Sequence, residues 1–166
     1  MRHLLMQQKL FSLKGEFSIM NEHDQIEYTV AGSFWRIPKY FEIYDKQNQI
    51  IARLTHRVWQ LLPKFSLEIN GFPESIEIAK RFSILKPKYD IAGLGITVTG
   101  NFWDMNFAIQ KDGFEIGRVD QRWLAMSSTY DINIEDEQYE TLVIALVVAI
   151  DYVKAQERAS SVSSAN

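Results

Sequence analysis

The sequence contains no cysteine. This absence excludes disulfide scaffolds, thiol catalysis and cysteine-ligated zinc, and it fits a reducing, intracellular setting. An excess of positive charge is missing as well, because 18 Lys and Arg stand against 21 Asp and Glu and give a net charge of −3. Proteins dedicated to nucleic acids carry a strongly basic face. We therefore expect no nucleic-acid partner.

Long apolar runs are also missing. The longest extends only from Leu142 to Ile150, whereas a membrane-spanning helix needs about 20 residues. Residues 1–13 do not resemble a signal peptide, because the polar residues 7–9 interrupt any apolar core. We expect a cytoplasmic protein without a transmembrane span, whose contact with a membrane, if it makes one, is peripheral.

Hydrophobic alternation dominates the chain up to about residue 134, as in strands with one buried and one solvent-facing side. The pattern predicts that Ile26, Tyr28 and Val30 lie on the buried side of a strand, with Glu27 and Thr29 on the other. Further alternating runs and the short turn sequences between them predict hairpins of an antiparallel sheet. The runs include 65–70 and 130–135, and the turns are at 21–24, 45–48, 70–73 and 111–113.

The C-terminal segment reads as a helix from Asp136 to about Arg158, because acidic residues begin it, basic residues end it and no turn sequence interrupts it. Its residues 142–150 are apolar on every side, and such a helix must be enclosed. The sheet is all that can enclose it. We therefore predict a closed barrel around the helix, which also removes exposed strand edges. An amphipathic helix on one face of an open sheet is the alternative.

An internal repeat supports a closed, symmetric barrel. Thr29–Trp35 (TVAGSFW) returns as Thr97–Trp103 (TVTGNFW). The series continues at slightly smaller offsets, as two copies of a several-stranded unit around a pseudo-two-fold axis would produce. Because the helix occurs once and both copies need it, we predict one domain over residues 1–158 and a disordered tail over 159–166. The later matches are Phe41–Ile43 with Phe107–Ile109, Arg53 and Arg57 with Arg118 and Arg122, and Phe65–Ile69 with Tyr130–Ile134.

Several of these segments resemble the LURP-one-related family, which belongs with tubby C-terminal domains and phospholipid scramblases. The resemblance covers the chain up to its tail. It implies a mainly β, tubby-like barrel of about twelve antiparallel strands around a hydrophobic C-terminal helix, in agreement with the patterns above. The segments that carry it are Gln7–Leu13, Phe17–Ile19, Tyr28–Gly32, Ile43–Asp45 and Ile51–Leu54.

What the resemblance implies about chemistry is limited. Tubby domains bind phosphoinositide headgroups at a basic surface site, which has no matching positions here. Residues 131–152 are similar to the scramblase helix with its final Ile-Asp-aromatic triplet, here Ile150-Asp151-Tyr152. However, Met126–Thr129 stands where scramblases carry an acidic calcium-binding run, and the cysteines that they lipidate are absent. Neither calcium dependence nor lipid anchoring is carried over.

No metal, cofactor or catalytic site is predicted. His3, His23 and His56 lie outside metal-ligand spacing, and His56 shares a strand face with Ile50, Ala52 and Leu54, which favours a core-edge histidine over a catalytic one. Residues 131–136 begin like a calcium loop but lack the glycine needed at its sixth position. The pair of glycines at 93 and 95 has no third glycine to complete a nucleotide loop.

Basic residues are the remaining candidates for a binding site. Arg53 and Arg57 share one strand face, and Arg118 and Arg122 share the matching face of the second repeat. A patch of such residues could hold phosphate through charge-assisted hydrogen bonds, beside aromatic rings suited to a lipid interface. The alternative, which we favour, is a solvent-exposed barrel surface on which arginines pair with Asp or Glu on neighbouring strands. The further basic candidates are Arg36, Lys39 and Lys64, and the aromatic ones are Trp35, Tyr40 and Trp59.

The leading functional hypothesis is a non-catalytic intracellular module that acts by surface recognition. Its ligand is expected to be an anionic phospholipid headgroup or a protein partner. A barrel filled by its own helix leaves no large interior pocket for a substrate, which argues against an enzyme. Two alternatives stay open: a scramblase-like lipid-handling protein, and a hydrolase with a surface cleft near His56.

Overall fold

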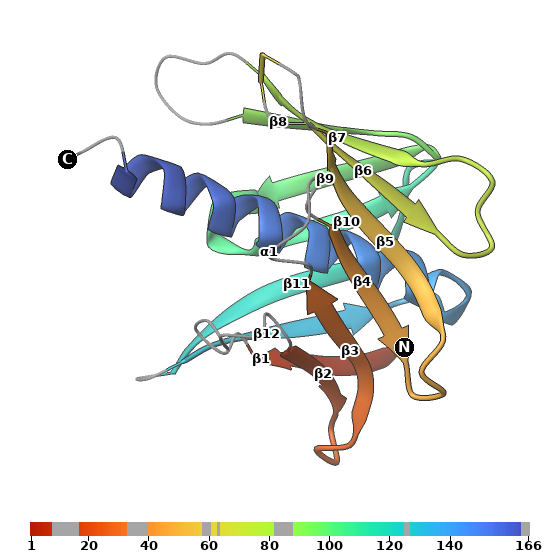
Figure 1. Ribbon diagram of the computed structural model, residues 1–166. Coiled ribbons are helices and arrows are strands. Elements are labelled where there is room, and N and C mark those ends of the chain that lie inside the picture. Colours follow the sequence, from red (N-terminus) through yellow and green to blue (C-terminus); the bar gives the residue numbers. More distant parts are fainter. Residues whose placement is uncertain are drawn as a thin grey trace.

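The computed structural model describes residues 1–7, 17–32, 40–57, 61–62, 64–81, 88–124 and 127–163. Twelve antiparallel strands form one sheet that curls around a single long helix (Figure 1). The strands are β1 (Arg2–Gln7), β2 (Phe17–Asn21), β3 (Ile26–Gly32), β4 (Tyr40–Asp45), β5 (Ile50–Arg57), β6 (Lys64–Ile69), β7 (Ile76–Arg81), β8 (Lys88–Ala92), β9 (Ile96–Asn101), β10 (Asn106–Lys111), β11 (Phe114–Leu124) and β12 (Ser127–Ile134). A 3₁₀ turn, η1 (Phe102–Asp104), joins β9 to β10.

The order of strands in the sheet is β8-β7-β6-β5-β4-β3-β2-β1-β12-β11-β10-β9. The N-terminal strand β1 therefore pairs with both β2 and β12, and so connects the N-terminal strands of the sheet with the C-terminal ones. The two outermost strands, β8 and β9, follow one another along the chain but are not paired in the sheet. The predicted mainly β barrel of about twelve strands is confirmed, and its closure is nearly complete.

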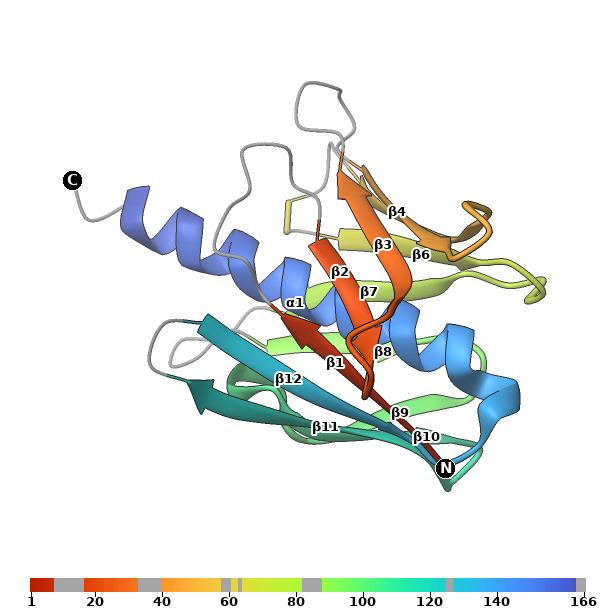
Figure 2. The ribbon, with the colours of Figure 1, turned by 90° about the horizontal axis from the view of Figure 1, so that it is seen from below.

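The helix α1 (Glu140–Ser163) passes through the barrel (Figures 1 and 2). In Figure 1, β6–β8 lie on one side of the helix and β1, β11 and β12 on the other. Every residue from Leu142 to Ile150 is at most 1% exposed. Aliphatic side chains from strands all round the barrel form one core with these residues. The predicted enclosed helix is confirmed, and the open-sheet alternative is wrong.

Both ends of the helix differ from the prediction. Asp136 is extended (φ −125°), and its carboxylate accepts a hydrogen bond from Gln138 N (3.1 Å) to cap a 3₁₀ turn, η2 (Glu137–Tyr139), so that α1 begins only at Glu140. At the other end α1 continues past Arg158 to Ser163. The predicted helix end was therefore placed too early, because neither glycine nor proline follows Arg158 to stop the helix. Residues 164–166 lie outside the described residues.

The internal repeat is visible in the strand pairing. β3–β6 and β9–β12 have the same neighbour order. Each copy carries a β-bulge with an isoleucine as its extra residue, Ile51 in β5 and Ile116 in β11. The two bulges accept matching backbone hydrogen bonds, from Asn70 N to Ile51 O (2.8 Å) and from Glu135 N to Ile116 O (3.0 Å). The predicted pseudo-two-fold repeat therefore extends to individual backbone contacts.

Bulges also explain where hydrophobic alternation gave the wrong prediction of which side chains are buried. Ile26 is 54% exposed and Glu27 only 9%, the reverse of the prediction. Ile19 pairs with Tyr28 and Met20 with Ile26, which leaves Glu27 as an extra residue that reverses the two sides of the strand. Ile50, expected on the same buried face as Ala52 and Leu54, is 43% exposed because the bulge at Ile51 follows it.

Candidate functional site

The predicted arginines do not form one patch. Arg53 and Arg57 lie on β5, whereas Arg118 and Arg122 lie on β11. These strands are separated in the sheet by β4, β3, β2, β1 and β12, so that they occupy opposite sides of the barrel (Figure 1). The repeat that relates the two pairs in sequence is what keeps them apart in space.

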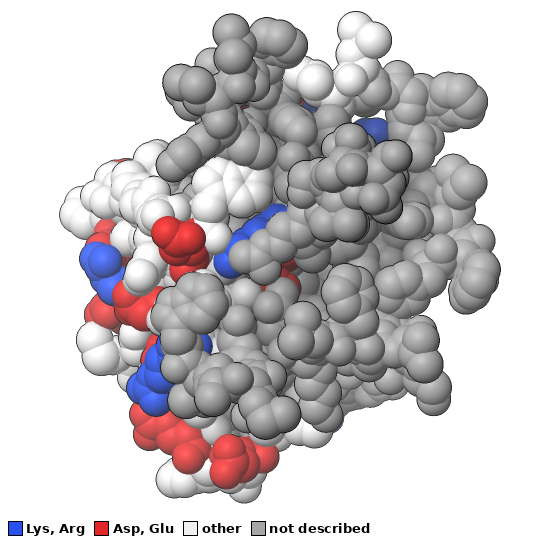
Figure 3. Space-filling model, turned by 90° about the vertical axis from the view of Figure 1, so that its left-hand side faces the viewer, with Lys and Arg blue, Asp and Glu red and all other residues white. Residues whose placement is uncertain are grey.

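Three of these four arginines contact a carboxylate. Arg53 Nε donates to Glu42 Oε1 (3.0 Å), Arg118 Nη2 to Glu115 Oε2 (2.7 Å), and Arg122 pairs with Asp131. Arg57 Nη2 donates to Ser66 Oγ (3.3 Å), and Lys64 Nζ lies 2.6 Å from Glu77 Oε2. On the face in Figure 3, described basic and acidic side chains are intermixed. Arg36, Lys39, Trp35 and Trp59 lie outside the described residues.

The histidines have structural surroundings. His56 is half-buried, and its ring stacks on Phe65 with centroids 4.8 Å apart. His3 Nε2 lies 2.9 Å from Asp131 Oδ1, and His23 is exposed in a turn. Within the described ranges, no three His, Asp or Glu side chains are grouped to hold a metal ion.

A groove of about 500 Å³ opens where β5 begins and β6 ends. Its volume is in the range of known ligand sites. Ile50, Ile51 and Phe72 provide apolar surface, and Arg53, Glu68 and Glu74 provide charge. Of the predicted site residues that the structure describes, only Arg53 lines this groove.

The groove results from local backbone geometry. Ala52 and Ile69 form the last pair of the β5–β6 ladder, and the bulge at Ile51 bends β5 beyond it. On the other side the chain turns sharply, since Phe72 N donates to Ile69 O (3.1 Å) and Gly71 takes φ +86°, a conformation that favours glycine. The side chains of Ile50, Ile51 and Phe72 line the groove between the bulge and this turn.

The two repeats differ at this position. Ile116, the bulge residue of the second copy, is 2% exposed. Its counterpart Ile51 is only half-buried, and the neighbouring Ile50 is 43% exposed. Phe72 is half-buried and packs against the core from the turn side. At the bulge residue, the first repeat therefore leaves accessible an apolar side chain that the second repeat covers.

The charges around the groove are unequal in number. Glu42 holds Arg53, and its second oxygen accepts a hydrogen bond from Tyr44 OH (2.7 Å). These contacts raise the pKa of Arg53 above its usual value, chiefly through the hydrogen bond to Glu42, and the same carboxylate raises the pKa of Tyr44 to about 12. Glu68 and Glu74 are exposed, and neither forms an ion pair with another described residue. The groove therefore has a negative rim.

The profile of the LURP-one-related family matches residues 2–151. The chain belongs to the LURP-one-related family. It is 26% identical over 163 residues to the uncharacterized protein YxjI of Bacillus subtilis, covering 98% of this chain and 99% of that protein. The crystal structure of the Arabidopsis thaliana protein AT5G01750 superimposes with a TM-score of 0.53 at 8% identity, over 90% of this chain and 92% of the other, and shows the same fold.

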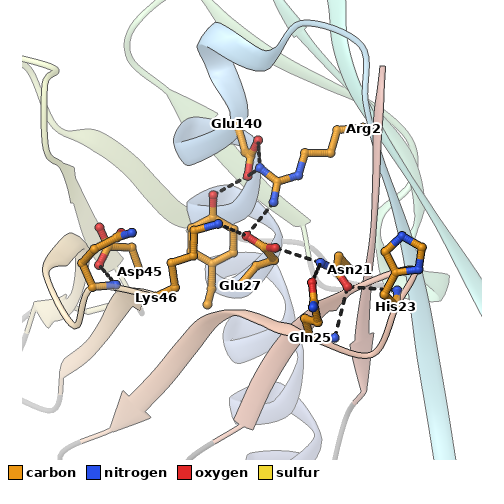
Figure 4. A network of polar contacts seen from close by, with 10 residues as sticks. Arg2, Asn21, His23, Gln25, Glu27, Asp45, Lys46 and Glu140 are labelled. Carbon is orange, nitrogen blue, oxygen red and sulfur yellow. Dashed lines mark hydrogen bonds and ion pairs between the residues drawn. The ribbon is translucent and has the colours of Figure 1, made fainter.

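A cluster of polar contacts lies at the start of α1 in this LURP-one-related barrel (Figure 4). Arg2 bonds both oxygens of Glu140 (2.7 and 2.8 Å) and Glu27 Oε2 (2.7 Å), and Tyr28 OH donates to Glu140. Burial alone would raise the pKa of Glu27, but hydrogen bonds from Arg2 and Lys46 outweigh it and hold that pKa below its usual value. Each charge is compensated, so we assign the cluster to fixing the helix in the barrel.

Sequence reasoning missed the groove of this LURP-one-related protein. It correctly predicted a turn at residues 70–73 but did not predict a binding surface beside that turn. The available signal was the end of the repeat, because the matched strands Phe65–Ile69 and Tyr130–Ile134 are followed by the unrelated sequences NGFP and EDEQ. It also could not foresee the cluster of Arg2, Glu27 and Glu140, whose members are distant in sequence.

Among the described residues, no helix has the length and apolar character to cross a membrane.

Proposed function

We propose that this LURP-one-related protein is a non-catalytic recognition module that binds a protein partner in the groove beside Ile51. The observation that carries the proposal is the difference between the repeats: Ile51 is half-buried where its counterpart Ile116 is 2% exposed, and the adjacent Ile50 is 43% exposed. An apolar surface that is left accessible at this bulge and covered at the equivalent one is available for binding.

The expected interaction is modest. Complete burial of an isoleucine side chain contributes about 1.5–3 kcal/mol, and Ile50 has 43% of its surface left to bury. Burial of this one side chain, together with a few weaker contacts around it, is suited to a transiently bound partner. A partner that inserts one or two side chains would also fit a groove of about 500 Å³.

Protein recognition is favoured over recognition of an anionic lipid headgroup. The described arginines predicted to hold phosphate lie on opposite sides of the barrel, and three of them are engaged with carboxylates. A headgroup at Arg53 would compete with Glu42, whose side chain is 12% exposed. Breaking a well-bonded pair of this kind costs more than an exposed ion pair returns.

A non-catalytic role is supported by what surrounds the groove. The helix fills the barrel interior from Leu142 to Ile150. Among the described residues, no histidine or lysine lines the groove to activate Ser75, its one hydroxyl group. His56, the predicted alternative for hydrolysis, stacks on Phe65 outside this lining.

The test places a photo-crosslinking amino acid at Ile50 and, as a matched control, at Phe114, which is 78% exposed on β11. We expect a discrete cross-linked protein from cell lysate at position 50 and none at 114. The captured partner, once purified, should bind the wild-type chain and lose at least about fivefold in affinity for Ile50→Asp, but not for Phe114→Asp. Equal cross-linking at both positions, or unchanged affinity of Ile50→Asp, would refute the proposal.

A further inference from the structure

We infer that the groove takes a cationic peptide segment, in which one apolar side chain is flanked by lysine or arginine. This inference rests on the proposed function and specifies the partner's chemistry. It starts from the apolar floor, where Ile50, Ile51 and Phe72 offer a place for a single aliphatic or aromatic side chain.

The sign of the flanking charge follows from the rim. Arg53 lies between Glu42 and Glu68 in the ladder, directly opposite each, and its hydrogen bonds go to Glu42. The charged residues that line the groove are Arg53, Glu68 and Glu74; Arg53 is hydrogen-bonded to Glu42 outside the lining, so Glu68 and Glu74 give the rim its negative sign. A cation beside the anchor is attracted to this rim, and an acidic segment is repelled by it.

Recognition must proceed through side chains. β5 lies between β4 and β6, and Ile51 O already accepts a hydrogen bond from Asn70 N (2.8 Å). Because no strand edge is free at this point, a bound segment cannot add a strand to the sheet. Specificity then depends on the anchor in the apolar floor and on the charges that reach Glu68 and Glu74.

Exposed charges give small and salt-sensitive contributions. An exposed ion pair is worth about 0.2–1 kcal/mol, which converts to a change in affinity of up to about fivefold for each carboxylate. Because the carboxylates are exposed, raising the ionic strength must weaken their effect. The apolar anchor should be insensitive to salt.

The experiment uses the full chain and fluorescein-labelled hexapeptides with a central leucine. Three peptides differ only in the residues that flank leucine: lysine, serine or glutamate. Fluorescence anisotropy should show the lysine peptide binding at least about tenfold more tightly than the glutamate peptide, with the serine peptide between them. Raising the salt from 50 to 500 mM should remove most of this preference.

Variants locate the binding. Glu68→Gln and Glu74→Gln should each weaken the lysine peptide about two- to fivefold, and Ile50→Ser should weaken all three peptides about three- to tenfold. The matched controls are Glu135→Gln, an exposed carboxylate in the equivalent turn of the second repeat, and Phe114→Ser; neither should change the affinity. Unchanged thermal unfolding of each variant shows that it is folded.

The outcomes separate the inference from the proposed function. If position 50 captures a partner and Ile50→Asp loses it, but the lysine and glutamate peptides bind equally or not at all, the inferred peptide chemistry is wrong and the recognition module stands. If Glu135→Gln weakens the lysine peptide as much as Glu68→Gln does, the charge effect is non-specific and the inference is again wrong. Binding to anionic vesicles that is lost with Ile50→Ser, without peptide binding, would overturn it in favour of a lipid surface.

Discussion

Opposite sides of α1 should be equally intolerant of truncation. Ile144 and Leu146 project from the helix about 160° apart, and both side chains are 0% exposed. We expect Ile144→Ala and Leu146→Ala each to lower the free energy of unfolding by about 2–5 kcal/mol, because each leaves a cavity in a closed core. In an amphipathic helix laid on an open sheet, one of the two would cost almost nothing.

Urea unfolding followed by circular dichroism measures the effect. With a slope of about 2 kcal/mol per molar urea for a chain of this size, the midpoint should fall by about 1–2.5 M for both variants at unchanged slope. The melting temperature should fall by about 4–20 °C. Ile50→Ala, at a residue that is 43% exposed, is the control and should cost less than about 1 kcal/mol.

One result would refute the reasoning. If one helix variant costs more than about 2 kcal/mol while the other stays within about 0.5 kcal/mol of wild type, one side of the helix faces solvent. The enclosed core, the argument against an interior site and the significance of the open groove would then be lost together.

Three further predictions concern other parts of the barrel. Because Glu27 has a lowered pKa, its contribution to stability is present above the ordinary pKa of 4.5 and is lost as the pH falls through the pKa of the folded state. Urea unfolding at pH 7 and pH 3 should show that the free energy of unfolding falls less in Arg2→Met than in the wild-type chain. An equal fall would contradict the role given to Arg2. Gly117→Ala should destabilise the protein by about 1–3 kcal/mol in thermal unfolding, because its Cβ would lie 2.8 Å from a Val143 methyl group in the enclosed helix, and a neutral variant would mean that the helix can move away. Backbone amides of β8 and β9, which have one neighbouring strand each, should exchange with deuterium faster than those of β1, which has two; equal protection would show that the barrel is fully closed in solution.

The enclosed helix could be predicted because its chemistry allows one arrangement. Residues 142–150 have no polar side chain to face water, and a chain of alternating strands contains nothing but a sheet to cover them. The internal repeat then predicted the pseudo-two-fold arrangement of the strands. Bulges escaped prediction because an extra residue such as Glu27 is defined by the register of the neighbouring strand, which alternation within one strand does not reveal.

Side-chain pairing escaped prediction for a similar reason. The arginines were correctly placed on strand faces, and pairing with carboxylates was the favoured alternative. Which carboxylate each one contacts depends on register, as with Arg53 opposite both Glu42 and Glu68. Whether a basic residue is available to a ligand is therefore a property of two strands together, which a single sequence does not give.

The groove arises because the two repeats share a single helix, which follows only the second of them. After β12 the chain passes through Glu135 and η2 into α1, whereas after β6 it must turn back at residues 70–75 to form β7. The symmetry therefore has to fail at the ends of these two strands, even though the backbone contacts to Ile51 and Ile116 are alike. The architecture requires the turn at this point, but it does not require the carboxylates of Glu68 and Glu74 on the rim. Exposed rim residues such as these can therefore change without any effect on the enclosed helix or the fold.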